Sequence, residues 1–352
     1  MNPSACFSQS YAEARGKFLE ACAAAGLSVE SHAHPLPGRD GEALALDVAR
    51  AGPMDARHLL LVSSGCHGVE GFCGSAVQIA LLRDPNWLAE ALAGGCAVLF
   101  LHAANPYGFS WWRRWTHENV DLNRNFLDFS APAPQNPGYE SLDPILIPRH
   151  WPARLSRARL LLHALRHGKR SLQAAISAGQ ASHPSGLFYV GAEPTWSNRT
   201  VRQVLRQHGS QCRELAWIDL HTGLGPRGYG EYIYSGDPSA ESLARARAWW
   251  GDVVRSTDEG NSVSVKLSGK MVHASFEECP QARLTSVTLE FGTLAGLKVL
   301  DALRAEQWLE RTPQAPAEQA GKIKRQLRDA FYVDEDDWKR QVLEQSRVAA
   351  DG

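Results

Sequence analysis

Short, continuous apolar runs are the feature that most constrains the fold of this chain. Residues 59–62 read LLLV and residues 97–101 read AVLFL, and such runs are typical of strands buried on both faces of a sheet. Further strands are predicted at 27–34, 43–49, 215–220, 231–234 and 286–291, and helices at 9–25, 72–82, 153–180, 197–208, 240–255 and 296–310. Strands that alternate with helices predict an α/β fold, with a central mixed, mostly parallel sheet flanked by helices.

Composition narrows the classes of partner and location. The 352 residues carry 37 Lys and Arg against 38 Asp and Glu, a formal charge of −1. We expect no nucleic acid and no membrane partner, because both attract clustered positive charge. No apolar run approaches the roughly 18 residues that span a bilayer, and the N-terminus does not read as a secretory signal. The seven cysteines contain no CxxC pair, which favours a reducing cytoplasm over a disulfide framework.

Polar, glycine-rich clusters accompany three of the predicted strands. The first reads LVSSGCHGVEG and contains His67 and Glu70, the second reads IDLHTGLG and contains His221, and the third reads VTLEFGT and contains Glu290. In open α/β sheets, ligands bind outside the carboxyl ends of the strands, where loops converge. Two imidazoles and a carboxylate form a catalytic zinc set that leaves a fourth position for water. Two interpretations are open: one zinc ion per chain held by His67, Glu70 and His221, or an HxxE spacing that arises by chance together with a His221 that only hydrogen-bonds in a buried corner.

Two further carboxylates near this set each allow two interpretations. Glu290 lies in an otherwise apolar strand, where an unpaired carboxylate would be costly, so it has either a function or a partner in a buried salt bridge. Asp219 stands two residues before His221. It either orients that histidine or is an ordinary carboxylate at the surface end of a strand.

The chain is predicted to form one domain over residues 1–352, with its core at about 55–300. A Pro-rich stretch followed by an Arg- and Leu-rich one indicates an insertion at 130–180 that covers one face of the core. The charged segment 312–352 predicts a helical C-terminal appendage.

One longer segment carries most of the functional information. It reads NPYGFSWWRRWTHENVDLNRNF from Asn105 to Phe126. Together with HGVEG before it, and DLHTGLG and the strand of Glu290 after it, this segment resembles the zinc carboxypeptidases, the carboxypeptidase A-like metallopeptidases. The wording is most similar to a poorly characterised bacterial branch of that family. The resemblance covers about residues 55 to 300. Six elements occur in the family's order: the HxxE pair, the NPYG turn, an arginine, the DLNRN motif, a distant histidine and a later glutamate. Agreement of all six by chance is remote.

The resemblance implies roles in catalysis. The family's zinc ligands match His67, Glu70 and His221, which implies one zinc ion per chain. Glu290 matches the general base, which takes a proton from the attacking water and later delivers it to the leaving amine. Arg113 matches the arginine that stabilises the developing oxyanion. Arg114 is the competing candidate for that role and is otherwise expected to bind substrate.

The resemblance also implies how substrate is held. Asn123 and Arg124 match the pair that binds the terminal carboxylate of the substrate, and a guanidinium suits a carboxylate because its donors reach both oxygens. The alternative is that Arg124 only braces its loop by pairing with Asp121 or Glu118.

The chain departs from the family at one position. The family's peptidases carry a tyrosine a short way before the catalytic glutamate, whereas the last tyrosine before Glu290 here is Tyr234. The intervening segment offers four other polar side chains: Ser262, Lys266, Lys270 and His273.

Three functions are consistent with this motif set. The first is a cytoplasmic zinc carboxypeptidase, a hydrolase that cleaves the C-terminal bond of a short peptide. The second is a zinc deacylase of N-acyl amino acids, as in the aspartoacylase-like branch that shares an HxxE and NR arrangement. Both need a substrate with a free carboxylate. The third, less favoured, is a non-catalytic binding protein that retains the pocket.

Overall fold

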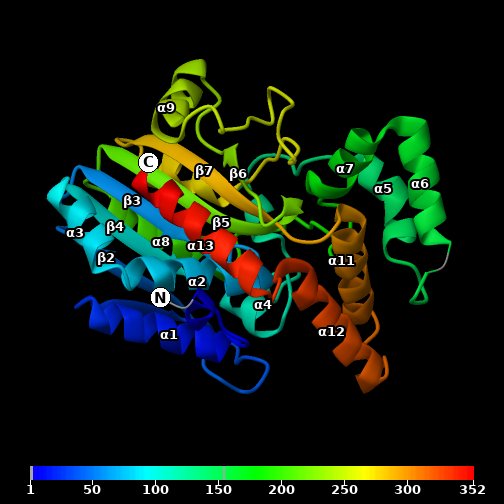
Figure 1. The fold of residues 1–352 in the computed structure, drawn as a ribbon. Helices are drawn as coiled ribbons and strands as arrows, with labels where there is room; N and C mark the ends of the chain where they lie inside the picture. The colour runs from blue at the N-terminus through cyan, green and yellow to red at the C-terminus, as the bar shows by residue number, and fades with distance from the viewer. Residues whose placement is uncertain (1–2, 154) are drawn as a thin grey trace.

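The computed structural model describes residues 3–153 and 155–352, and a single sheet of seven strands lies at the centre of this part of the chain (Figure 1). The strands are β1 (Val29–Ala33), β2 (Ala45–Ala51), β3 (His58–Ser63), β4 (Cys96–His102), β5 (Glu214–Arg227), β6 (Gly230–Tyr234) and β7 (Arg283–Gly292). Their order across the sheet is β1-β2-β4-β3-β5-β7-β6. The four central strands β4, β3, β5 and β7 run parallel, and β1, β2 and β6 join by antiparallel pairing. The predicted α/β class with a mixed sheet is confirmed.

Helices cover both faces of the sheet. They are α1 (Tyr11–Ala24), α2 (Gly71–Leu82), α3 (Pro85–Ala93), α4 (Pro106–Ser110), α5 (Pro137–Leu146), α6 (Ser156–His167), α7 (Lys169–Ser177), α8 (Trp196–Gly209), α9 (Ala240–Trp250), α10 (Ala274–Glu278), α11 (Gly296–Glu310), α12 (Ala317–Phe331) and α13 (Asp336–Asp351). Four short 3-10 turns complete the elements: η1 (Pro3–Cys6), η2 (Gly68–Glu70), η3 (Leu122–Arg124) and η4 (Met271–His273). Every described helix is too short or too polar to cross a bilayer.

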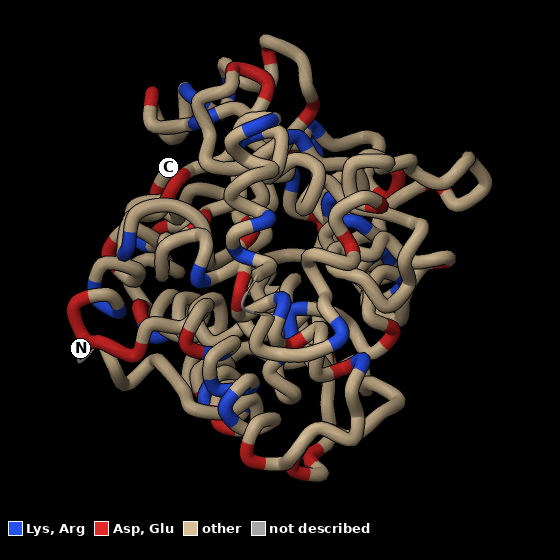
Figure 2. The backbone as a smooth tube through the Cα atoms, turned by 90° about the vertical axis from the view of Figure 1, so that its right-hand side faces the viewer, with Lys and Arg blue, Asp and Glu red and all other residues tan. Residues whose placement is uncertain are grey.

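The apolar runs form central strands because both of their faces are covered. Along β3, Leu60 and Val62 pack into the core that includes α1 and α2, whereas Leu59 and Leu61 pack into the core that includes α8. Alternate side chains of a strand point to opposite faces, so a strand between two helical layers needs apolar residues at every position. Acidic and basic residues are spread along the whole backbone (Figure 2), as expected for a nearly neutral chain.

The predicted insertion at 130–180 contains α5, α6 and α7, which lie together on one side of the molecule next to α11 (Figure 1). Within it, Asn136 donates from Nδ2 to the carbonyl of Ala175 at 3.0 Å. The insertion is fixed to α11 by Arg304, which donates from Nε to the carbonyl of Leu146 at 2.8 Å. The insertion therefore rests on the element that follows β7, near the carboxyl end of the sheet.

The segment 312–352 is helical, as predicted, and forms α12 and α13. Trp338 in α13 is fully buried and donates from its indole nitrogen to the carbonyl of Gly292, at the end of β7, at 2.9 Å. These helices therefore pack as part of the core rather than as a surface appendage. The extent of the single domain stays a prediction.

Candidate metal centre

The turn after β3 carries His67 and Glu70 at the carboxyl edge of the sheet. Its close approach to the next segment requires glycine, because a side chain at Gly68 would overlap the backbone of Gly108 in α4. The turn is fixed by two main-chain hydrogen bonds, from Gly68 to the carbonyl of Arg114 at 3.1 Å and from the next residue to the carbonyl of Arg113 at 2.8 Å. The histidine–glutamate pair and the two arginines are thus joined through the backbone.

Three ligand side chains meet where this turn faces β5. Nδ1 of His67 and Nδ1 of His221 are 3.1 Å apart. Glu70 places Oε1 at 2.9 Å from the first nitrogen and Oε2 at 3.0 Å from the second. All three side chains are buried, and they form a group that is close enough to hold a metal ion. Ligand atoms about 2.0–2.1 Å from a tetrahedral zinc ion lie roughly 3.3 Å from one another, so this spacing fits zinc.

The second nitrogen of each histidine faces a buried carboxylate. Nε2 of His67 is 3.1 Å from Oδ1 of Asp121, and Nε2 of His221 is 2.7 Å from Oδ2 of Asp219. A proton on each Nε2 leaves the lone pair of Nδ1 for a metal, and such carboxylate partners fix both the tautomer and the ring orientation. Asp219 is therefore a buried partner of His221 rather than a surface carboxylate.

The two glutamates of the site have opposite electrostatic surroundings. Burial opposes the charge of Glu70, but His67 and His221 outweigh it and hold the pKa of Glu70 well below its usual value. Burial, together with the negative charge of Glu70, raises the pKa of Glu290 to about 7. A carboxylate with a pKa near neutrality is suited to exchange protons with water at physiological pH.

The two neighbouring arginines point in opposite directions. Trp112 adopts a positive φ of 50° just before them. Arg114 turns toward the metal centre and donates from Nη1 to Oε1 of Glu70 at 2.8 Å. Arg113 turns away and donates from Nε to Oε1 of Glu306 in α11 at 2.8 Å. Arg113, predicted as the catalytic arginine, does not line the cavity beside the metal centre, whereas Arg114 does.

Asn123 and Arg124 lie together in η3, as their motif requires. Oδ1 of Asn123 accepts from the main chain of Met271 at 2.8 Å, which leaves its Nδ2 as a donor. Arg124 donates from Nε and Nη2 to the carbonyl of Ser177, at the end of α7, at 3.0 and 2.6 Å. Its Nη1 lies 3.9 Å from Oδ1 of Asp121. The guanidinium is thus anchored to the insertion and still has two N–H groups left to donate.

A cavity of about 530 Å³ joins these residues. Its polar lining includes His67, Arg114, Asn123, Arg124, His221, Lys270 and Glu290. The volume lies within the range of pockets that bind small molecules. The structure thus places two of the three predicted metal ligands, His67 and His221, around one space with Asn123, Arg124 and Glu290.

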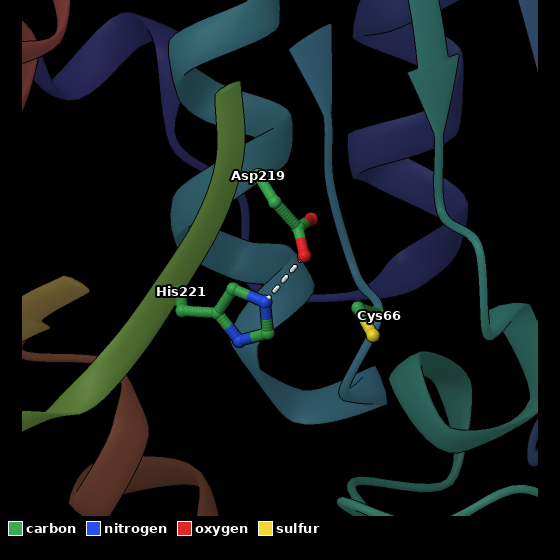
Figure 3. Close-up of side chains that lie close together, drawn as sticks. All are labelled: Cys66, Asp219 and His221. Carbon is green, nitrogen blue, oxygen red and sulfur yellow. Dashed lines mark hydrogen bonds and ion pairs between the residues drawn. The ribbon is translucent and has the colours of Figure 1, made fainter. Parts of the chain in front are cut away.

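A second group of possible ligands lies behind the first. Cys66, Asp219 and His221 are also close enough to hold a metal ion, and Figure 3 shows Asp219 and His221 on β5 with Cys66 on the neighbouring loop. Burial, followed by the nearby carboxylates, raises the pKa of the Cys66 thiol well above its usual value, whereas a metal ligand needs a thiolate. Neither Cys66 nor Asp219 lines the cavity. The group of His67, Glu70 and His221 is therefore the better candidate, because two of its three members line the cavity.

One family model matches nearly the whole of the chain whose fold is described above. The family model described as "Protein of unknown function (DUF2817)" matches residues 7–345. The chain belongs to this family. No curated protein matches the sequence of this DUF2817 member.

Several solved structures are similar to this DUF2817 protein. Bovine thrombin-activatable fibrinolysis inhibitor, in complex with tick carboxypeptidase inhibitor, is 13% identical, with 96% of this chain and 98% of that chain covered and a TM-score of 0.47. Carboxypeptidase A from Helicoverpa armigera is 14% identical, with 93% and 75% covered and a TM-score of 0.45. Succinylglutamate desuccinylase/aspartoacylase from Rhodobacter sphaeroides is 14% identical, with 82% and 65% covered and a TM-score of 0.35.

Two residues of the DUF2817 site were not assigned from the sequence. From the sequence, Asp121 is expected only as an alternative partner that braces Arg124. Its place in the DLNRN motif is the one sequence signal for its contact with His67. Four polar residues lie in the segment where the family has its tyrosine, and of these only Lys270 lines the cavity. The other three are Ser262, Lys266 and His273. Lys266 instead pairs with Asp258 at 2.9 Å.

Proposed function

We propose that this DUF2817 protein is a zinc-dependent hydrolase that cleaves a C-terminal peptide bond next to a free carboxylate. The observation that carries the proposal is the meeting of two imidazoles and one carboxylate, with orienting carboxylates behind both imidazoles, in a cavity that also contains Glu290 and two arginines. Structural zinc sites are closed by four protein ligands, whereas catalytic sites have three and an open position. A three-ligand group that faces a cavity supports the catalytic kind.

Glu290 is the proposed general base. It is paired with His221 in the register of β5 and β7, so the two side chains lie on the same face of the sheet. Its Oε1 accepts from the main chain of Leu224 at 2.9 Å, which holds the carboxylate in place. His67, Glu70 and His221 would hold the zinc ion, which would supply a bound water of lowered pKa and polarisation of the scissile carbonyl. Glu290 accepts the proton of the attacking water and transfers it to the leaving amine.

Arg114 is the proposed oxyanion arginine in place of Arg113, since Arg114 is the one that lines the cavity. Its Nη2 lies 2.7 Å from Nε2 of His67. A neutral imidazole has one donor and one acceptor nitrogen. With Nδ1 used as a ligand and the proton on Nε2, His67 cannot accept from Arg114, so Nη2 is left to donate to the substrate oxygen as negative charge develops.

Asn123 and Arg124 are proposed to bind the free carboxylate. The donors that remain on them are Nδ2 of Asn123 and one N–H on each terminal nitrogen of Arg124. Charge-assisted hydrogen bonds to a carboxylate are the strong ones, about twice as strong as neutral bonds.

A hydrolysis screen with zinc-loaded protein tests the proposal. Peptides with a free C-terminus should be cleaved, the same peptides with an amidated C-terminus should not, and a chelator or Glu290→Gln should abolish turnover. Turnover of Glu290→Gln within a few-fold of the wild type would overturn the role of Glu290 as general base and make it structural. No turnover of any carboxylate substrate, with zinc bound, would favour the non-catalytic binding protein.

A zinc deacylase of N-acyl amino acids is the second candidate, because an amino acid product also carries a carboxylate for Arg124 and the cavity has a long apolar wall. We also propose a cytoplasmic site of action, supported by the absence of a CxxC pair among the seven cysteines of the sequence. The absence of nucleic acid and membrane partners stays a prediction.

A further inference from the structure

The cavity continues from the metal centre along a wall that the metal chemistry does not need. Helices α6 and α7 of the insertion, together with α11, supply this apolar wall: Leu160, Leu161, Leu172, Ile176, Leu300 and Leu303. A volume of about 530 Å³ suits a ligand of drug-like size and exceeds what one amino acid side chain occupies. The apolar wall thus offers room for a large apolar group of the substrate.

The charges around the cavity favour an anion. Between Asp143 and Glu193 the insertion contains seven Lys and Arg and no acidic residue. Lys169 from this stretch lines the cavity, as do Arg124 and Lys270. Phe126 and Met271 donate main-chain hydrogen bonds that hold the segment of Lys270 against the loop of Arg124. A ligand that fits both the basic residues and the apolar wall of the cavity is amphiphilic, with a negative head and an apolar chain.

Two leucines extend the apolar wall to the edge of the cavity. Leu161 in α6 and Leu297 in α11 line the cavity and yet are 51% and 55% exposed. They come from two different elements that face the same space. Apolar surface of this kind at the mouth of a ligand site marks where a ligand extends beyond the enclosed part.

We propose that the substrate is an amino acid acylated with a long apolar chain, whose carboxylate binds at Asn123 and Arg124 with the ammonium of Lys270 in the same lining, and whose acyl chain lies against the apolar wall. The inference rests on the proposed function. Hydrolysis breaks the amide C–N bond, adds the water oxygen to the acyl carbon and transfers a proton to the amine. The products are a long-chain carboxylic acid and a free amino acid.

Binding of a chain-length series tests the inference without turnover. N-acetylglycine, N-octanoylglycine and N-dodecanoylglycine are titrated into the Glu290→Gln protein by calorimetry, below their micelle-forming concentrations. Each buried methylene should tighten binding about fourfold, so the octanoyl probe should bind at least a hundredfold more tightly than the acetyl probe. Equal affinity for the acetyl and octanoyl probes would overturn the inference.

A matched pair of leucines in α6 tests the location of the chain. Leu161→Gln should weaken binding of the dodecanoyl probe several-fold and leave the acetyl probe unchanged. Leu165→Gln is the control, because Leu165 lies on the same helix, is 84% exposed and does not line the cavity. Equal weakening by both substitutions would show that the chain adsorbs to exposed leucines, which contradicts the inference. Both side chains are more than half exposed, so neither substitution disturbs the core.

Kinetics on the same series separates this inference from the function on which it rests. A rise of kcat/KM with chain length in the zinc-loaded wild type supports both. Peptide hydrolysis without any dependence on acyl length overturns the inference and keeps the hydrolase. Chain-selective binding with no hydrolysis of any substrate keeps the acyl site and overturns the hydrolase.

Discussion

Replacing the two neighbouring arginines one at a time should separate folding from catalysis. Arg113 is 4% exposed and bonds Glu306 at 2.8 Å and Asn119 at 3.0 Å. The side chain of Glu306 is fully buried, and its remaining cation is Lys324 at 2.8 Å. Arg113→Met therefore leaves the buried carboxylate of Glu306 with one of the two cations that balance its charge.

The magnitude follows from the burial. Breaking a buried ion pair on one side costs about 3–5 kcal/mol, and the remaining contact with Lys324 favours the low end, about 3 kcal/mol. The entropy of unfolding is about 2.1 cal/mol/K per residue, or roughly 0.74 kcal/mol/K for 352 residues. The expected fall in Tm is therefore about 4 °C. A double variant with Glu306→Leu should recover part of this loss, because both buried charges are then removed.

Arg114→Met should behave in the opposite way. Loss of a donor to a developing oxyanion costs about 10²–10³ in kcat, so this variant should lose most of its turnover while zinc still binds. Thermal unfolding and kcat/KM are measured on both variants, with activity assayed well below either Tm. The placement of the two side chains would be refuted if Arg113→Met lost more than a hundredfold in activity while Arg114→Met stayed active. Arg113 would then be the catalytic arginine.

Four further outcomes follow from the site. His221→Ala should lose zinc, because a three-ligand site has no spare ligand, and full occupancy by elemental analysis would contradict the ligand set. Glu290→Gln should keep the fold and the metal and lose about 10²–10⁴-fold in turnover, whereas a loss of only a few-fold would make Glu290 structural. Arg124→Ala should impair cleavage of free-carboxylate substrates and affect amidated ones little, whereas equal losses with lower thermal stability would mean that Arg124 only braces its loop. Burial lowers the pKa of Lys270 to about 8, so its ammonium is charged below that pH and loses its charge above it. In the Glu290→Gln protein, where the carboxyl of Glu290 no longer titrates, affinity for a carboxylate ligand should fall as the pH rises from 7 to 9, and a further Lys270→Met substitution should remove this dependence.

Much of the fold could be predicted because the apolar runs report directly on the layers around them. The runs at 59–62 and 97–101 became β3 and β4 with only small changes at the ends. The predicted helix at 153–180 is broken at Gly168, which adopts a positive φ of 89° and separates α6 from α7. The short helices α3 and α5 were not predicted, and each begins with a proline after a side-chain cap rather than with a long amphipathic pattern.

The sequence predicts which residues form the site but not which way each side chain points. His67 follows β3 and His221 lies within β5, the neighbouring parallel strand, so their meeting follows from the pairing of these two strands. Arg114 lines the cavity and Arg113 does not, and a motif that is aligned by residue type cannot distinguish two adjacent arginines. The residue before them, Trp112, also adopts a positive φ, which is uncommon for a residue other than glycine.

Asp121 shows why the DLNRN motif acts as one unit. Its Oδ1 lies 3.1 Å from Nε2 of His67 and accepts from the main chain of Asn123 at 3.0 Å, and its Oδ2 lies 3.3 Å from Nε of Arg114. The cations Arg114 and Arg124 outweigh its burial and hold its pKa well below the usual value, so Asp121 stays charged. One buried carboxylate therefore orients the proposed metal ligand His67, positions the proposed oxyanion arginine and shapes the turn that presents the proposed carboxylate-binding pair. Because these contacts share one side chain, substitutions at Asp121 cannot separate metal binding from substrate binding, and the roles are resolved only by changing the residues around it.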